Sequence, residues 1–357
     1  MGLALPAGHV SVSIPVAAIR EVAEASASAT ALAAGLQFGE PDLGRVARVV
    51  TEAATNILQH AEHGEILLRS FALGAGTVLE VLALDQGPGI ANVAQAARDG
   101  FSTRGGRGLG LGAIARHSTF FDVSSAPGKG TALLARIGPL QSSPPQETDR
   151  PAALERGVVC TPKRGEQVCG DAWAVAEADG RSTILIVDGL GHGDSAFVAA
   201  QRALLAFGEH GGERPLAKLR SLHAALRETR GAVAALAEID WTLREVRYAG
   251  VGNIAGSLLP VEGKSAHLVS HNGTLGETVT RLQEFTYAWP SRGLLVLHSD
   301  GLANDWELES YPGLTRKDPS LIAGVLYRDF ARQRDDVVVF VGRERELGTA
   351  RLDGGPR

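Results

Sequence analysis

The first 138 residues switch between alternating and helical patterns of apolar positions. Alternating or continuous apolar runs predict strands, and apolar positions three and four residues apart predict helices. The predicted strands are 9–15, 64–73, 77–84, 120–125 and 130–137. The predicted helices are 16–36, 42–61 and 108–117, and residues 92–105 are predicted to form a mobile lid. This order predicts an α/β sandwich with helices on one face of a sheet.

The rest of the chain has a different pattern, with many short apolar runs and two helical stretches at 194–209 and 215–228. Residues 139–156 separate the two patterns and are rich in proline and polar residues, as linkers are. The predicted parts are a first domain at 1–138, a linker at 139–156, a second domain at 157–345 and a tail at 346–357. The sequence leaves open whether the two domains touch.

Composition narrows the class of protein. A chain of 357 residues with 44% hydrophobic residues has material for two packed cores. The net charge of −5 argues against a nucleic-acid-binding protein that relies on a basic face. Cys160 and Cys169 are too few for a disulfide framework, so a reducing cytoplasm is the expected location. The N-terminus lacks the early basic residues of a signal peptide, and no uncharged run reaches transmembrane length, so no membrane association is expected.

Four polar or glycine-rich motifs follow one another in the first domain. Glu52 and Asn56 lie four residues apart, which places both on one helix face. The run Asp-Gln-Gly-Pro-Gly at 85–89 ends a predicted strand, and Gly-Lys-Gly-Thr at 128–131 precedes another. Between them, residues 101–112 hold a cluster of glycines that leads into a helix, where free backbone N–H groups can bind phosphate. A glycine loop alone is weak support for such a site, but four motifs in this order predict a nucleotide site.

This order of motifs resembles the GHKL ATPases, and among them the small serine kinases of bacterial partner switching, in particular the stressosome switch kinases. The resemblance covers about residues 9–138 and rests on the segments 52–61, 85–90, 101–117 and 128–137. It implies a GHKL (Bergerat) α/β sandwich that binds ATP and Mg²⁺ under the lid.

The resemblance also implies roles for single residues. Asp85 would accept a hydrogen bond from the adenine amino group, Asn56 would hold Mg²⁺, and Thr131 would support the adenine end of the site. Glu52 would act as the base for the hydroxyl group of a serine or threonine on a protein substrate, because phosphoryl transfer needs one group that orients the nucleophile. Contacts to the nucleotide are expected from glycines along these motifs, namely Gly87, Gly89, Gly106, Gly108 and Gly110.

Acidic residues mark the ends of predicted strands in the second domain. Asp171 precedes one apolar run, Asp188 follows the run 183–187, Asp300 follows another, and Asp335 precedes the run 337–341. Each aspartate alone is weak support for a site, because Asp-Gly is also a common turn pair. Four carboxylates at the ends of separate strands could nevertheless converge on a hard cation such as Mg²⁺ or Mn²⁺.

This series resembles the PPM (PP2C-like) serine/threonine phosphatases of the SpoIIE group, on the segments 187–193, 298–302 and 334–341. The segment 250–256 and the short length are most similar to the stressosome feedback phosphatases. The resemblance covers about residues 157–342 and implies a PPM-type αββα sandwich with two metal ions. The ligands it implies are Asp188 bridging both ions, the Gly189 carbonyl on one, Asp300 and Asp335 on the other, and Asp171 acting through a metal or its waters. Gly170 stands where the larger family has an acid, which puts a third metal site in doubt.

Some of these residues keep an ordinary alternative explanation. Glu52 and Asn56 could form a solvated pair on a helix surface. His192 could either donate a proton to the leaving oxygen or serve only the glycine turn around it. Asp336 is a weaker ligand candidate than its neighbour Asp335, and the register of Arg164 as a phosphate contact is undetermined.

The sequence therefore predicts a bifunctional partner-switching regulator. Its first domain would phosphorylate a serine or threonine of a STAS-domain protein in a stressosome-like complex, using ATP, and its second domain would remove that phosphate. Two alternatives stay open. The first domain could bind and sequester a partner, such as a sigma factor or a downstream phosphatase, with little catalysis. It could also sense ATP for a chain that acts only as a phosphatase.

Overall fold

The computed structural model of the protein describes residues 10–73, 76–96, 110–140, 154–209 and 212–345. Strands along these residues form three five-stranded sheets, of which one lies in the first domain and two lie in the second. No helix within these described ranges is long and apolar enough to cross a membrane.

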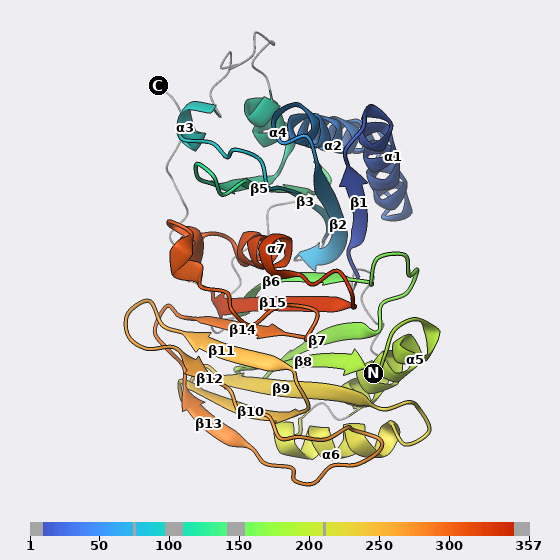
Figure 1. Cartoon of the computed structure of the whole chain (residues 1–357), viewed down its shortest axis with the longest axis vertical. Coiled ribbons are helices and arrows are strands. Elements are labelled where there is room, and N and C mark those ends of the chain that lie inside the picture. Colours follow the sequence, from blue (N-terminus) through green and yellow to red (C-terminus); the bar gives the residue numbers. More distant parts are fainter. Residues whose placement is uncertain (1–9, 74–75, 97–109, 141–153, 210–211, 346–357) are drawn as a thin grey trace.

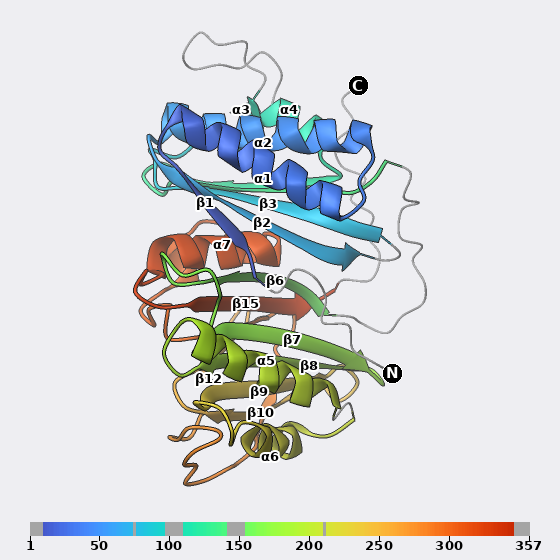
Figure 2. The same cartoon turned by 90° about the vertical axis from the view of Figure 1, so that its right-hand side faces the viewer.

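The first domain builds one antiparallel sheet in the order β1-β2-β3-β5-β4. Its strands are β1 (Val12–Val16), β2 (Gly64–Leu73), β3 (Gly76–Asp85), β4 (Phe120–Ser125) and β5 (Thr131–Ile137). Its helices are α1 (Ile19–Gly35), α2 (Glu40–His60), α3 (Val93–Ala96) and α4 (Gly110–His117). Helices α1 and α2 lie across one face of this sheet (Figure 2).

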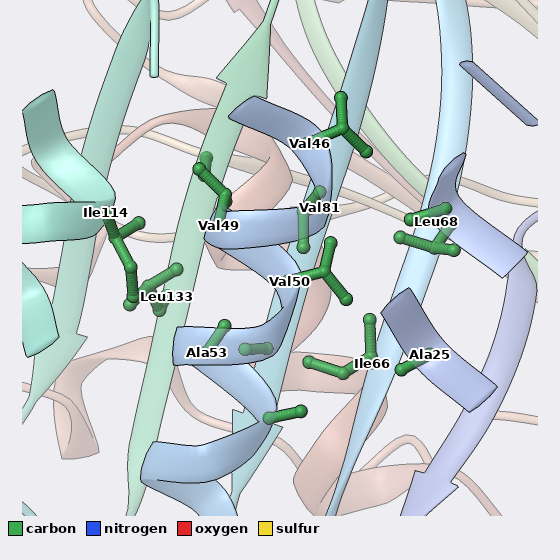
Figure 3. Close-up of a cluster of buried hydrophobic side chains, with 14 of the residues drawn as sticks. Ala25, Val46, Val49, Val50, Ala53, Ile66, Leu68, Val81, Ile114 and Leu133 are labelled. Carbon is green, nitrogen blue, oxygen red and sulfur yellow. The ribbon is translucent and has the colours of Figure 1, made fainter. Parts of the chain in front are cut away.

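Helix α2 is the main support of that face. Pro41 sits in its first turn, where a missing backbone N–H costs no helical hydrogen bond. Its apolar residues recur three and four positions apart, and Val46, Val49, Val50 and Ile57 are all buried. Figure 3 shows this stripe packed against side chains of β2, β3 and β5. The polar residues of α2 are consequently held in fixed positions above the sheet.

The second domain stacks two sheets face to face, in the orders β12-β11-β14-β15-β6 and β13-β10-β9-β8-β7. The strands of the first are β6 (Leu154–Thr161), β11 (Ala255–Leu259), β12 (Ala266–His267), β14 (Leu294–His298) and β15 (Val337–Glu344). The strands of the second are β7 (Asp171–Ala178), β8 (Arg181–Gly189), β9 (Ala232–Asp240), β10 (Glu245–Val251) and β13 (Phe285–Ala288). Helices α5 (Asp194–Glu209) and α6 (Pro215–Ala225) cover one outer face, and α7 (Pro319–Phe330) covers the other (Figures 1 and 2). The expected αββα sandwich is confirmed.

Helix α7 also packs against the first domain, between its sheet and strands β6 and β15 (Figure 1). The face of the first sheet that lies away from α1 and α2 carries Leu67, Leu82, Leu84, Ala132 and Leu134. These side chains form one hydrophobic cluster with buried residues of α7 and β15. The two domains therefore share a core, which answers the question that the sequence left open.

A buried ion network crosses the same interface. Arg136 of β5 makes two parallel hydrogen bonds of 2.8 Å to the carboxylate of Asp318, the N-cap residue of α7. Its Nε donates to Glu80 at 2.9 Å, and Arg69 donates to the other Glu80 oxygen at 2.6 Å. Ser320 donates to Glu80 as well, at 2.9 Å. Burial alone would raise the pKa of Glu80, but the guanidinium groups of Arg69 and Arg136 hold it below its ordinary value.

The element boundaries differ from the sequence prediction by a few residues. The strand expected at 9–15 is β1 at Val12–Val16, and the helix expected at 215–228 ends at Ala225. Strand β6 begins at Leu154, inside the stretch expected to be a linker, because residues 154–156 pair with β15. The strand at 64–73 and the helix at 194–209 have the predicted limits.

Candidate nucleotide and metal sites

The end of β3 and the turn after it form one part of the candidate nucleotide site. Asp85 is the last residue of β3, and its Oδ1 accepts the backbone N–H groups of Gly87 at 2.9 Å and Thr131 at 3.1 Å. Because both bonds go to Oδ1, Oδ2 is the oxygen that can accept a hydrogen bond from a ligand. Burial raises the pKa of Asp85 despite these two bonds. The turn requires glycine at position 89, where φ is +73° and a Cβ atom would overlap the Ala126 carbonyl group.

Helices α2 and α4 form another part. The start of α4 touches the Asn56 side chain, because a Cβ atom at Gly110 would lie 3.0 Å from Asn56 Oδ1 and 3.2 Å from Nδ2. Glu52 lies one turn before Asn56 on α2, and both side chains are half-buried. The structure thus brings the amide group expected to hold Mg²⁺ against the end of the glycine-rich stretch. Gly106, Gly108 and most of the expected lid fall within 97–109, outside the described residues.

The second candidate site lies at one end of the sandwich of the second domain. Asp171 at the start of β7 is paired directly with Asp188 near the end of β8. Asp300 follows β14, and Asp335 precedes β15. The side chains of Asp188, Asp300 and Asp335 line one cavity of about 450 Å³. Asp171 is buried beside them, with 2% of its surface exposed.

The carboxylates of this cavity oppose one another's ionisation. Burial, together with Asp300 and Asp335, raises the pKa of Asp188 to about 8. Burial and Asp188 raise the pKa of Asp171, and burial and Asp335 raise the pKa of Asp300. A divalent cation would remove this repulsion, and an all-oxygen donor set suits hard cations such as Mg²⁺ and Mn²⁺. The residues present therefore fit the expected type of metal.

The ligand set is not closed in this arrangement. Within the described ranges, no three His, Cys, Asp or Glu side chains are placed so that they could hold an ion as they stand.

Two polar residues that brace the aspartates were not singled out from the sequence. Ser299 Oγ donates to Asp171 Oδ2 at 2.5 Å and accepts the Val338 N–H at 3.0 Å. Asn253 Nδ2 donates to Asp300 Oδ2 at 2.7 Å. The segment 250–256 that contains Asn253 contributed to the family resemblance, but nothing in its pattern indicated that this side chain reaches Asp300.

The weaker candidates have defined partners. Asp336 accepts the backbone N–H groups of Lys163 at 2.7 Å and Gly170 at 2.8 Å, so it braces the loop before β7. His192 Nδ1 lies 2.8 Å from Glu166 Oε1, and both side chains are partly exposed. This pair fixes the imidazole ring, and Nε2 is the nitrogen that can face a leaving oxygen. Arg164 lines a second cavity of about 740 Å³ between the two domains, which Asp85 also lines and which has Asp335 in common with the first.

Comparisons with known families agree with the two-part architecture. Residues 16–137 match the histidine kinase-like ATPase domain family, and residues 178–343 match the family of stage II sporulation protein E (SpoIIE). The serine/threonine-protein kinase RsbT of Bacillus subtilis (strain 168) is 38% identical over 100 residues, which are 28% of this chain and 75% of that kinase. The phosphoserine phosphatase RsbX of the same organism is 24% identical over 140 residues, which are 39% of this chain and 70% of that phosphatase.

A solved structure is similar to part of the chain. A structure described as the bacterial stressosome, a modular system adapted to control secondary messenger signalling, aligns with a TM-score of 0.50 and 29% identity. The alignment covers 54% of this chain and 100% of that chain. The chain belongs to the histidine kinase-like ATPases through its first domain, of the RsbT type, and joins this domain to a SpoIIE-type phosphatase domain related to RsbX.

Proposed function

We propose that the protein phosphorylates a serine or threonine on a STAS-domain partner with its first domain and removes that phosphate with its second. The observation that carries the proposal is the presence of both candidate sites in one chain, each with the polar groups its reaction needs. The relatives are a serine/threonine-protein kinase and a phosphoserine phosphatase, which supports opposite reactions in the two domains. The similarity to a stressosome structure supports a STAS-domain partner in a stressosome-like assembly.

In the proposed kinase reaction, ATP binds with its adenine amino group on Asp85 Oδ2. The start of α4 at Gly110 faces the phosphates, where the N-terminal end of a helix favours negative charge. Asn56 holds the Mg²⁺ that accompanies ATP, and Glu52 accepts the proton of the attacking hydroxyl group. A phosphate ester forms on the partner and ADP leaves. Positioning and charge neutralisation supply most of the catalysis in reactions of this kind.

In the proposed phosphatase reaction, Asp188, Asp300 and Asp335 would hold divalent cations, with the Gly189 carbonyl group as a further ligand and Asp171 behind them. Two such cations, when bound, would activate water as the nucleophile and neutralise the charge of the phosphate. Asn253 and Ser299 keep Asp300 and Asp171 in position. His192, oriented by Glu166, donates a proton to the serine oxygen as the phosphate leaves.

Intact-mass spectrometry on a STAS-domain protein encoded beside this chain tests the proposal. The partner is incubated with the full chain, ATP and Mg²⁺, after which ATP is removed and Mn²⁺ is added. The matched variants are Glu52→Gln for the kinase reaction and Asp300→Asn for the phosphatase reaction. We expect the partner to gain one phosphate, to lose it with the wild type, and to keep it with Asp300→Asn.

Two other results of this experiment would each favour one of the alternative functions. A partner that is retained by the chain in the presence of ATP but never gains phosphate would indicate a sequestering module. A chain that removes phosphate at a rate set by ATP, without ever adding it, would indicate an ATP-sensing phosphatase. Either result would overturn the proposal of two reactions on one partner.

A further inference from the structure

The last turn of α7, in the second domain, contacts the end of β3, which carries Asp85 of the candidate nucleotide site. Arg328 donates from Nη1 to the backbone carbonyl oxygen of Asp85 at 3.1 Å. Its Nε and Nη2 donate to the two carboxylate oxygens of Asp329 at 2.8 and 2.6 Å. The Arg328 side chain is 6% exposed. A guanidinium group fixed by two bonds to one carboxylate has little freedom left, so Arg328 is a rigid contact for Asp85.

Gln86, the residue after Asp85, makes further hydrogen bonds from the first domain to the last turn of α7. Gln86 Nε2 donates to the Arg328 carbonyl oxygen and to Asp329 Oδ1, both at 3.2 Å. Tyr311 donates to the other oxygen of Asp329 at 2.7 Å, which anchors the turn of α7 in the second domain. The chain at Asp85 and Gln86 is thus bonded to the other domain at the point where β3 ends and the glycine turn begins.

The position of the main chain at the end of β3 determines where the Asp85 carboxylate lies. Its Oδ1 is held by the turn at Gly87 and by β5 at Thr131, both within the first domain. These bonds fix the side chain relative to the turn. Arg328 fixes the main chain of Asp85 from the face of the sheet that lies away from α1 and α2. A side chain that reads one amino group must be placed within a few tenths of an ångström, because hydrogen bonds weaken quickly with distance and angle.

We propose that Arg328 is a positioning residue for adenine recognition, supplied to the nucleotide site of the first domain by helix α7 of the second. The inference rests on the proposed function, in which Asp85 binds the adenine amino group. It goes beyond that proposal because it makes the selectivity of the nucleotide site depend on a residue outside the ATPase domain. Arg328 acts through Asp85 and does not itself touch the nucleotide.

Inosine diphosphate separates positioning from general stability. It has a carbonyl oxygen where ADP has the amino group, so position 6 of its base cannot donate a hydrogen bond to Asp85. Displacing Asp85 weakens ADP binding and leaves IDP binding nearly unchanged. A loss of folded protein would weaken both nucleotides by the same factor.

The experiment is isothermal titration of the full chain with ADP and with IDP at one fixed concentration of Mg²⁺. The variants are Arg328→Gln, Arg328→Lys and Gln86→Ala, and the last of these changes an exposed residue on the first-domain side of the contact. The matched control is Arg343→Gln, since Arg343 also donates to a carboxylate, that of Glu155, and to a backbone carbonyl oxygen, that of Lys317.

We expect Arg328→Gln to weaken ADP binding about 3- to 30-fold while IDP binding changes less than about twofold. Arg328→Lys should recover part of the loss, Gln86→Ala should lower the preference for ADP in the same direction, and Arg343→Gln should keep the wild-type preference. An equal loss for both nucleotides, or no loss for either, would overturn the positioning role while the nucleotide site itself stands. A wild-type chain that binds neither nucleotide would overturn the proposed kinase function along with this inference.

Discussion

Replacing Arg136 by methionine tests whether the two domains are stabilised as one unit. The Arg136 guanidinium group lies between Glu80 of its own sheet and Asp318 at the start of α7. Its carbon centre also lies 5.5 and 4.9 Å from the ring centres of Phe71 and Phe120. Methionine keeps the apolar contact with these rings. It removes the charge and all four hydrogen bonds of the guanidinium group, which go to Glu80, to both oxygens of Asp318 and to Ser320 Oγ.

The magnitude follows from what the variant leaves behind. The Asp318 side chain is 3% exposed and the Glu80 side chain is 2% exposed, so both carboxylates would stay buried. Removing one partner of a buried ion pair costs about 3–5 kcal/mol. Glu80 keeps Arg69, and Asp318 keeps the Ser320 N–H at 2.9 Å, so we expect the lower end, about 3 kcal/mol.

A second substitution isolates the pair. Asp318→Asn neutralises the other charge, and asparagine is as good an N-cap residue as aspartate, so the start of α7 is preserved. The double variant Arg136→Met/Asp318→Asn leaves no uncompensated charge at Asp318. We therefore expect it to be less destabilised than the sum of the two single variants, by about 1–2 kcal/mol.

The assay is urea unfolding at pH 7, followed by far-ultraviolet circular dichroism and by tryptophan fluorescence. All four tryptophans lie at or after position 173, in the second domain, whereas Arg136 lies in the first. Loss of the network should therefore move the fluorescence midpoint to lower urea together with the dichroism midpoint. A fluorescence transition that stays at the wild-type midpoint, or additive effects of the two substitutions, would refute energetic linkage through this network.

Three further predictions concern the two sites. Glu52→Gln should lower phosphorylation of the partner by about 100-fold or more while the affinity for ADP with Mg²⁺, measured by isothermal titration, stays within about twofold; a parallel loss of ADP affinity would argue against its role as the base. Asp300→Asn should abolish Mn²⁺-dependent hydrolysis of p-nitrophenyl phosphate, yet raise the melting temperature in EDTA at pH 8, because one repelling carboxylate is gone; an unchanged melting temperature would mean that the carboxylates do not interact. In EDTA, the pKa of Asp188 is about 8 in the folded chain against 3.8 for an ordinary aspartate, so the unfolded chain releases this proton near pH 4 while the folded chain keeps it up to about pH 8. The resulting contribution to stability is complete below pH 4 and is lost as the pH rises towards 8. The melting temperature should fall across that window, less steeply in Asp188→Asn, and a curve that rises there would contradict the raised pKa of Asp188.

The sequence predicted each domain well because the periodic patterns that specify local elements also specify which face is buried. The stripe of α2 and the limits of β2 and α5 followed from such patterns. The core that the two domains share was harder to predict from the sequence. Within strand β3, residues 78–84 are apolar except for Glu80, which is typical of a strand buried on both faces. The sequence predicted helices on one face of this sheet only, and nothing in the pattern pointed to α7, which covers the other face and lies more than 200 residues later in the chain.

The residues of the candidate sites also fall into those that the sequence predicted and those that it did not. Motif order and strand ends selected Asp188, Asp300 and Asp335, and the structure brings all three to one cavity. Asn253 and Arg328 were not identified from the sequence, because their importance depends on partners far along the chain. The Asn253 partner is 47 residues away, and the Asp85 carbonyl that Arg328 contacts is 243 residues away. Spacing rules describe neighbours on one helix or strand, so they cannot reveal such pairs.

The position of α7 also limits how the two sites could influence each other. Its residues from Leu321 to Leu326 are buried in the core shared by both domains, so a substitution there lowers the stability of both. Its last turn, from Tyr327 to Phe330, is only partly buried, and the chain beyond it returns to the Asp300 loop through the Arg332 N–H on the Gly301 carbonyl oxygen at 2.8 Å. A nucleotide that shifts Asp85 and a cation that shifts Asp300 would therefore act on the same turn. Any resulting coupling would be equal in both directions, because linkage between two binding equilibria is reciprocal. Substitutions in this last turn separate such coupling from stability, and substitutions in the core of α7 cannot.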